Sequence, residues 1–193
     1  MGFDVHGLNP RINNDNFKTY NKYKDMDFSD KWKILDNNKK LKEKYWKEED
    51  EFQAANPGTY FRNNCWWWRP LWDYVCINCK SLTEDDHRSG HYNDGHKISE
   101  EKATLIGLAL KAQLKEGAIK EYADRYKTNI EALPKVVCTL CNGNNYGNKK
   151  KKDCHACKRT GEVNDFSSFY PFDVENVKEF AEFCLQSGGF RIS

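Results

Sequence analysis

Apolar side chains recur at helical spacing in five stretches of the chain. In the first, Leu41, Tyr45 and Phe52 lie near one face and lysine and glutamate cover the rest. Serine at 99 and aspartate at 173 are suitable N-caps for two of the others, and glycines or prolines end them. The pattern predicts helices over about 36–55, from Pro70 to Leu82, over 99–117, from 118 to the proline at 134, and over 173–188.

Shorter apolar and aromatic runs predict strands. They cover Phe3–Val5, Tyr60–Trp68 and Phe190–Ile192, and the last could pair with the first. Residues 13–30 and 84–97 are polar and rich in turn formers, so we expect irregular structure there. Together these elements predict an α+β fold, a mainly helical compact domain with a few short strands.

Composition favours a folded chain without a strong surface charge. Aromatic residues make up 14% of the 193 residues and charged residues 31%, and the net charge is +2. That charge by itself predicts no strong attraction to nucleic acid or anionic lipid. The longest apolar run, Leu105–Leu110, is far shorter than the roughly 20 residues of a membrane span. The first residues lack the basic and apolar regions of a secretory signal, so we expect a cytoplasmic protein.

Two Cys-x-x-Cys pairs predict a metal site. Cys138 and Cys141 are separated by twelve residues from Cys154 and Cys157. Zinc takes four ligands in a tetrahedron, and two such turns can supply four thiolates and leave no open position. A closed site of this kind is structural, so we expect one structural Zn²⁺.

The residues that follow each pair resemble the Cys-x-x-Cys-x-Gly-x-Gly units of the DnaJ cysteine-rich domain. Gly143 and Gly161 match the pattern, whereas Asn145 and Arg159 each replace a glycine. The resemblance covers only residues 137–163 and implies a zinc knuckle. It does not imply a chaperone, because the His-Pro-Asp tripeptide of a J-domain is missing.

The same segment is strongly basic. Residues 135–161 contain seven lysines and arginines and one acid, so the segment carries +6 and the remaining chain −4. Nucleic acid could therefore bind there through phosphate contacts. Against this, lysines near four thiolates could merely offset their charge, and Tyr146 is the only aromatic residue available for stacking. The predicted contacts are Lys149, Lys150, Lys151, Lys152, Lys158 and Arg159.

A tryptophan-rich segment is the other unusual feature. Three consecutive tryptophans on a strand cannot all face one core, so we expect at least one to line a cleft or a second contact surface. Indole faces stack on planar rings, and guanidinium groups grip phosphates or carboxylates. The alternative is an aromatic core in which the asparagines satisfy backbone groups. The predicted ligand-binding residues are Arg62, Asn63, Asn64, Trp66, Trp67, Trp68, Arg69, Trp72, Asn93 and Asp94.

Further cysteines and histidines offer weaker candidates. Cys65, Cys76 and Cys79 could hold a second metal, but buried structural thiols are the simpler interpretation. A polar loop places His87, His91, Asp94 and His96 within ten residues, which would suit a catalytic metal. Their spacing matches no helical or strand template for ligands, so a solvated loop is the alternative.

Several motifs spread over the chain resemble a little-characterised family of bacteriophage and bacterial proteins. They are Gly2-Phe-Asp-Val-His-Gly-Leu-Asn-Pro10, Tyr60-Phe-Arg-Asn-Asn64, Trp68-Arg-Pro-Leu-Trp72 and Tyr92-Asn-Asp-Gly95. The resemblance implies an accessory or counter-defence protein that acts in the host cytoplasm. It supplies no mechanism.

The sequence therefore predicts a main α+β domain over residues 1–134, a zinc knuckle inserted at 135–163, and a C-terminal helix and strand at 164–193 that pack back on the main domain. The leading hypothesis is a non-catalytic binding protein that captures a nucleotide-like ligand or a host partner. One alternative is a nucleic-acid-associated knuckle protein. Another is a metal-dependent hydrolase that uses the histidine loop. Without a nucleophile elbow or a phosphate-binding loop, enzyme activity is not favoured.

Overall fold

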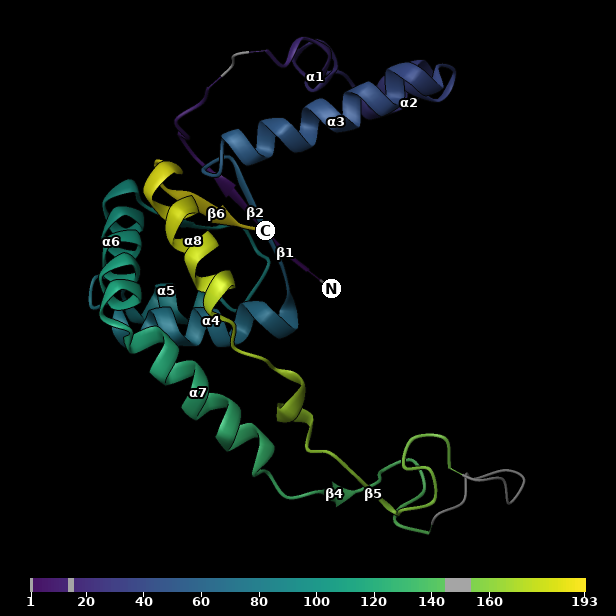
Figure 1. Cartoon of the computed structure of the whole chain (residues 1–193), viewed down its shortest axis with the longest axis vertical. Coiled ribbons are helices and arrows are strands. Elements are labelled where there is room, and N and C mark those ends of the chain that lie inside the picture. The colour runs from purple at the N-terminus through teal and green to yellow at the C-terminus, as the bar shows by residue number, and fades with distance from the viewer. Residues whose placement is uncertain (1, 14–15, 145–153) are drawn as a thin grey trace.

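The computed structural model describes residues 2–13, 16–144 and 154–193. Helices predominate, as predicted, and a few short antiparallel strands complete an α+β fold (Figure 1). The elements in chain order are β1 (Gly2–Gly7), α1 (Lys18–Tyr23), α2 (Phe28–Asp36), α3 (Lys39–Ala55), β2 (Tyr60–Asn64), α4 (Cys65–Asn78), α5 (Glu84–Ser89), β3 (His96–Ile98), α6 (Glu100–Glu116), α7 (Ala118–Glu131), β4 (Val136–Val137), β5 (Glu162–Val163), the 3-10 helix η1 (Phe166–Phe169), α8 (Val174–Gln186) and β6 (Phe190–Ile192).

Four strands form one antiparallel sheet in the order β2-β1-β6-β3. The predicted pairing of the last strand with the first is confirmed, because Val5 lies opposite Ile192. Side chains alternate across a strand, and Phe3, Val5 and Phe61 turn to the buried face. Strands β4 and β5 form a separate two-stranded sheet at the base of the knuckle.

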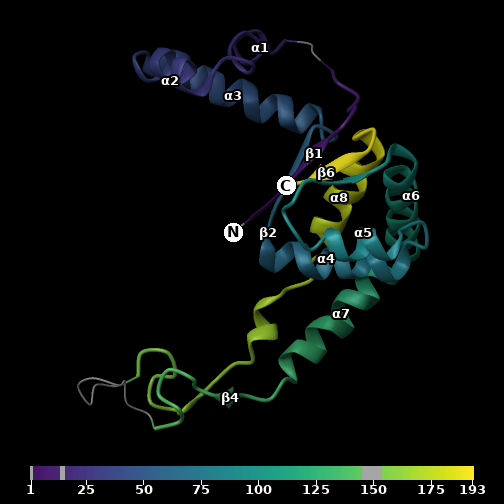
Figure 2. The same cartoon turned by 180° about the vertical axis from the view of Figure 1, so that it is seen from behind.

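The main core lies between this sheet and helices α4, α6 and α8, which gather on one side of it in both views (Figures 1 and 2). Trp68 is fully buried at the centre, where its ring stacks on Phe3 at 5.3 Å and on Trp72 at 5.5 Å. Its indole N–H donates to the Gly90 carbonyl at 2.8 Å. A side chain at Gly90 would collide with Trp72, so only glycine fits against this indole.

Helix α4 corrects the strand predicted over Tyr60–Trp68. The strand stops at Asn64, whose side-chain oxygen accepts hydrogen bonds from the backbone N–H groups of Trp66 and Trp67. This cap starts the helix at Cys65, so Pro70 lies inside it and not in its first turn. The aromatic run suited a strand by propensity, but the capping asparagine and the burial of Trp68 and Trp72 favour a helix.

The two segments predicted to be irregular also contain helices. Residues 13–30 include α1 and the start of α2, which Asp27 caps by accepting from the Ser29 N–H. Residues 84–97 include α5, where Thr83 and Asp86 form a capping box, and strand β3. In both places the helices are short and carry too few apolar residues to show a helical period.

Helices α1, α2 and α3 form an arm with its own small cluster around Tyr23, Leu35 and Tyr45. The predicted helix over 36–55 begins at Lys39, because Asn38 caps it and separates it from α2. No helix within the described residues is long and apolar enough to cross a lipid bilayer.

Helices α6 and α8 pack closely because α6 carries a glycine at the contact. The predicted N-cap Ser99 and terminator Gly117 of α6 are both confirmed, as is the Asp173 cap of α8. A Cβ atom at Gly107 would lie 2.6 Å from Leu185 Cγ and 3.0 Å from the Ala181 carbonyl oxygen. The two helices could not keep this distance with a larger residue.

We predict that Gly107→Leu lowers the free energy of unfolding by about 1–3 kcal/mol, because the added atoms must push α8 away. Leu108→Gln is the matched control, since Leu108 is 55% exposed on the same helix. Its effect should stay within about 0.5 kcal/mol. Urea unfolding of both variants measures the difference, and equal stabilities would contradict the packing.

Candidate metal centre

The four predicted cysteine ligands meet in one buried cluster. Their sulfur atoms all lie within 4.8 Å of one another, and each residue is at most 4% exposed. Within residues 2–13, 16–144 and 154–193, no other group of three or more histidine, cysteine or acidic side chains comes close enough to share a metal ion. The cluster can therefore coordinate a metal.

The distances between the sulfurs fit a tetrahedral ion. Cys138 Sγ lies 3.8 Å from Cys154 Sγ, and Cys141 Sγ lies 3.7 Å from Cys157 Sγ. Four sulfurs at about 2.3 Å from a zinc ion are separated by about 3.8 Å along each edge of their tetrahedron. A disulfide would require about 2.05 Å, and all eight cysteines are free.

The backbone repeats the same shape after each cysteine pair. Asn142 and Gly143 follow the first pair with φ of +49° and +77°, and Lys158 and Arg159 follow the second with +48° and +72°. Such left-handed residues turn the chain sharply around the sulfurs. Arg159 thus adopts the conformation of the glycine that it replaces in the DnaJ-like pattern, whereas Asn145 lies outside the described residues.

The environment of Cys157 favours a thiolate. Burial by itself raises the pKa of this thiol, but hydrogen bonds from the Gly161 backbone and from neighbouring groups outweigh burial and lower the pKa to about 7. The thiolate is the form that binds metal. The site is therefore prepared for a cation by its backbone as well as by its sulfurs.

Almost nothing else holds the knuckle together. Its buried cluster consists of the four cysteines, and Val163 is the one partly buried apolar residue packed against them among the described residues. Two strand pairs, Val136 with Val163 and Val137 with Glu162, close its base, and the Cys138 N–H donates to the Gly161 carbonyl at 2.8 Å. A metal ion held by the four cysteines would therefore contribute much of the free energy that folds this segment.

Two of the remaining cysteines of the main domain, Cys76 and Cys79, stay neutral at pH 7. Burial is the largest cause that raises the pKa of Cys76 to about 12 and of Cys79 to about 11. Among the described residues, Cys65, Cys76 and Cys79 do not come close enough to one another to share a metal ion. The interpretation as structural thiols therefore fits their environment better than a second metal.

The predicted histidine loop separates into different contacts. His96 Nε2 lies 2.9 Å from Asp86 Oδ1, and His91 Nε2 lies 3.3 Å from Asp73 Oδ1. The Nε2 atom of His87 is buried and makes no hydrogen bond within the described part of the chain. Asp94 accepts from the His96 backbone N–H. These side chains do not converge on one metal position.

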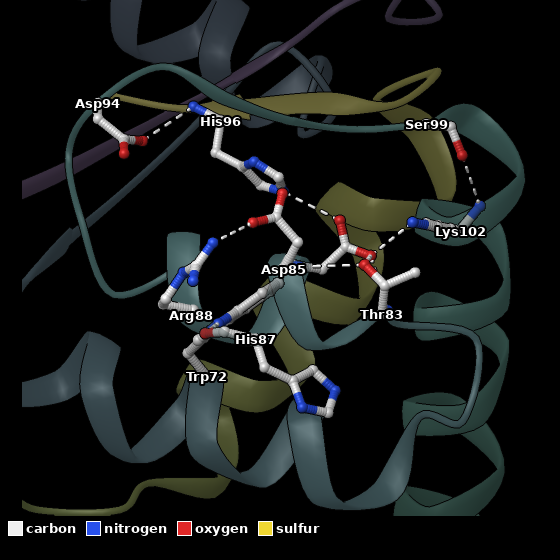
Figure 3. Close-up of polar contacts among 10 residues, drawn as sticks. Trp72, Thr83, Asp85, His87, Arg88, Asp94, His96, Ser99 and Lys102 are labelled. Atoms are coloured by element: carbon white, nitrogen blue, oxygen red, sulfur yellow. Dashed lines mark hydrogen bonds and ion pairs between the residues drawn. The ribbon is translucent and has the colours of Figure 1, made fainter.

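Asp86 instead joins three elements through buried polar contacts, and Figure 3 labels its partners Thr83, His96 and Lys102. It receives hydrogen bonds from Thr83 at 2.8 Å, His96 at 2.9 Å and Lys102 at 2.5 Å, and its side chain is 5% exposed. Burial by itself raises the pKa of this carboxyl. The bonds from Lys102, Thr83 and His96 outweigh burial and hold the pKa well below its usual value. The contacts tie α5 to β3 and α6.

The tryptophan segment is divided between the core and the surface. Trp68 and Trp72 are fully buried, and their indole N–H groups donate to the carbonyls of Gly90 and His87. Trp67 is half-buried in α4. Trp66 is half-buried as well and contacts Phe166 and Tyr170, with ring centroids 5.2 and 4.9 Å apart. The expectation that one indole faces a second surface is met by Trp66.

The polar members of the predicted ligand set are also dispersed. Asn63 is buried and donates to Asn176 at 2.7 Å, and Asn64 caps α4. Arg69 is exposed and donates to the Tyr170 hydroxyl at 3.2 Å. Asn93 donates to the Gly2 carbonyl, and Arg62 lies 3.8 Å from Asp4. The ten residues do not line one cavity.

A cavity of about 760 Å³ lies beside the cysteines instead. It is lined by residues from β4, from β5, from the second cysteine turn and from η1, among them Lys135, Val137, Lys158 and the two phenylalanines of η1. Phe166 is 62% exposed and Phe169 55% exposed. Sequence reasoning missed both residues, because they lie outside the knuckle and reach it only when the chain folds back beside β4.

No family model matches this chain, and neither the curated proteins nor the solved structures contain a match to it. The class that the fold and the site define is an α+β protein with a buried cluster of four cysteines that can hold a metal ion.

We predict that Cys138→Ser removes most of the bound metal and unfolds the knuckle, because three thiolates cannot close the site. The main core should keep its melting temperature, since its buried cluster does not include these cysteines. Metal analysis and thermal unfolding measure the two effects. Cys65→Ser is the control and should retain the metal; unchanged metal content in the Cys138 variant would refute the site.

We predict that Asp86→Asn costs about 3 kcal/mol at pH 7, because it leaves Lys102 and His96 partly buried without their anion. The folded pKa of Asp86 lies below its unfolded value of about 3.9, so its contribution exists above that pH and fades as the pH falls through the folded pKa. The stability difference between the variant and the wild type should therefore shrink near pH 3.

Asp85→Asn is the matched control. Asp85 is the preceding residue, and it forms an exposed pair with Arg88 that should contribute less than about 1 kcal/mol. Urea unfolding at pH 7 and pH 3 measures both variants. Equal losses at the two positions would contradict the role given to Asp86.

Proposed function

We propose that the four cysteines hold one structural zinc ion and that the zinc-folded knuckle binds single-stranded nucleic acid. The observation that carries this proposal is the cavity beside the cysteines, which combines exposed aromatic rings with lysines. It joins two features that the sequence alone kept apart, a basic knuckle and a surface for base stacking.

Zinc suits the site better than other common ions. Four thiolates are soft ligands that select zinc, copper(I) or iron–sulfur clusters over magnesium and calcium. The distances between the sulfur atoms also match the edge length of a tetrahedral zinc–sulfur site. The site leaves no position open for water or substrate. The ion would stabilise the knuckle without performing chemistry.

Exposed aromatic rings supply the stacking surface. The rings of Phe166 and Phe169 lie 6.3 Å apart, and each also contacts Trp66. Tyr170 extends the group toward Arg69, whose guanidinium lies 5.9 Å from its ring centre. Bases stack on such rings with little regard to sequence, at about 1–3 kcal/mol per base.

Charge favours the same ligand. The segment 135–161 carries +6, or +4 when four thiolates and Zn²⁺ contribute −2. Lys135 and Lys158 line the cavity itself. The net charge of the segment also includes four lysines that lie outside the described residues, Lys149, Lys150, Lys151 and Lys152. A polyanion with planar bases satisfies both the charge and the rings, whereas an apolar peptide would satisfy only the rings.

We predict that a fluorescent oligo-dT binds the protein with an affinity that falls as salt increases. Phe166→Ser together with Phe169→Ser should weaken binding by about tenfold or more, because two stacking rings are lost. Phe28→Ser is the matched control, since Phe28 is a 72% exposed aromatic residue on α2 of the arm. Fluorescence anisotropy measures each affinity.

Lys135→Gln tests the electrostatic part. Each lost phosphate contact should reduce the slope of log affinity against log salt by about 0.7 for single strands. Lys33→Gln on the arm should leave the slope unchanged. If neither the phenylalanine substitutions nor salt changes the affinity for oligo-dT, the proposal is overturned. Tighter binding of an acidic peptide than of oligo-dT would show that the ligand is a peptide and would overturn it as well.

A further inference from the structure

The solvent-facing side of the four-stranded sheet carries an ordered row of side chains. His6 lies opposite Tyr60 on β2 and opposite Arg191 on β6, and Arg191 in turn lies opposite Lys97 on β3. The register therefore places Tyr60, His6, Arg191 and Lys97 side by side across all four strands. Their neighbours along each strand point into the core, so these four point away from it.

This row remains accessible. Arg191 and Lys97 are exposed, and Tyr60 and His6 are half-buried. Helices α4, α6 and α8 lie on the opposite face of the sheet (Figure 2). Neither Arg191 nor Lys97 makes an ion pair with any described residue. Two cations thus stand free at one end of the row.

The other end of the row is aromatic and neutral. The rings of His6 and Tyr60 lie 5.1 Å apart. Burial, followed by the nearby Arg191 charge, lowers the pKa of His6, so its imidazole is uncharged at neutral pH. Two flat rings are therefore available for contact with a planar group.

An acidic side chain limits what can bind at the aromatic end. Asp4 accepts a hydrogen bond from the Tyr60 hydroxyl and lies 3.8 Å from Arg62 Nε. A polyanion crossing the whole row would bring a phosphate close to this carboxylate. A ligand with one planar end and one anionic end avoids that repulsion.

We propose that this sheet face binds a free nucleoside monophosphate, with the base on Tyr60 and His6 and the phosphate on Arg191 and Lys97. Adjacent strands are about 4.8 Å apart, so the aromatic and cationic halves of the row are roughly 10 Å apart. The site is separate from the knuckle and does not depend on its function.

The test is an NMR titration of the zinc-loaded protein with adenosine monophosphate, and with adenosine and inorganic phosphate as partial ligands. The monophosphate should shift the backbone amides of β1, β3 and β6 and should bind more tightly than either part. Equal binding of phosphate alone, or shifts confined to other regions, would overturn the proposal.

Variants separate the two halves of the row. Arg191→Gln with Lys97→Gln should weaken binding at least about fivefold, because two charge contacts are lost. Lys178→Gln on α8 is the control and should not change it, since Lys178 already pairs with Glu175. Tyr60→Leu should weaken binding, and Tyr60→Phe should restore it because the ring is retained.

The last experiment adds an oligo-dT to the complex of the protein with adenosine monophosphate. If the nucleic acid binds only at the knuckle, the nucleotide shifts on the sheet should persist. Displacement of the nucleotide would show that the row belongs to a longer path for nucleic acid, which would overturn the assignment to a free nucleotide.

Discussion

The convergence of four buried cysteines on one point is the constraint on which the knuckle depends. Between α7 and α8 the described chain has one buried apolar cluster, the four cysteines, with Val163 packed beside them. So small an apolar cluster cannot offset the entropy lost when the described part of the knuckle becomes ordered. In the proposed zinc-bound protein, metal–sulfur bonds supply that free energy locally, and they also fix the direction in which the chain enters and leaves the site.

The direction in which the chain leaves the cysteine cluster decides which residues line the neighbouring cavity. Strands β4 and β5 pair directly outside the cysteines, so the chain leaving β5 runs back toward α4 through η1. Phe166 and Phe169 are thereby held next to Lys135, although they are more than thirty residues apart in sequence. Trp66 supports them from the main domain. Metal binding and the proposed recognition of nucleic acid are thus coupled through a short stretch of backbone.

The main domain depends on a different interaction, the burial of Trp68 and Trp72 against the sheet. Helix α4 brings them inward because Asn64 ends β2 and caps the helix at the next residue. The same geometry leaves Trp66 outside the core. A single asparagine therefore decides which indoles stabilise the fold and which one is available at the surface.

The cysteine cluster could be predicted from sequence, because ligand spacing is a local property and two tight turns determine it. The pairing of β1 with β6 was also predictable from two apolar runs. By contrast, the strand predicted through Trp68 was wrong, since propensity favoured a strand while the Asn64 cap favours a helix. Phe166 and Phe169 could not be assigned to a site, because their position depends on the path of the returning chain. The partners of His91 and His96 depend on tertiary packing in the same way.

The most direct measurement is binding of one oligo-dT before and after the metal is removed with a chelator, and again after zinc is restored. Circular dichroism follows the main domain in the same samples. Affinity should fall to background when zinc is removed and return when zinc is added, while the helical signal of the main domain persists. Unchanged affinity in the metal-free protein would contradict the account.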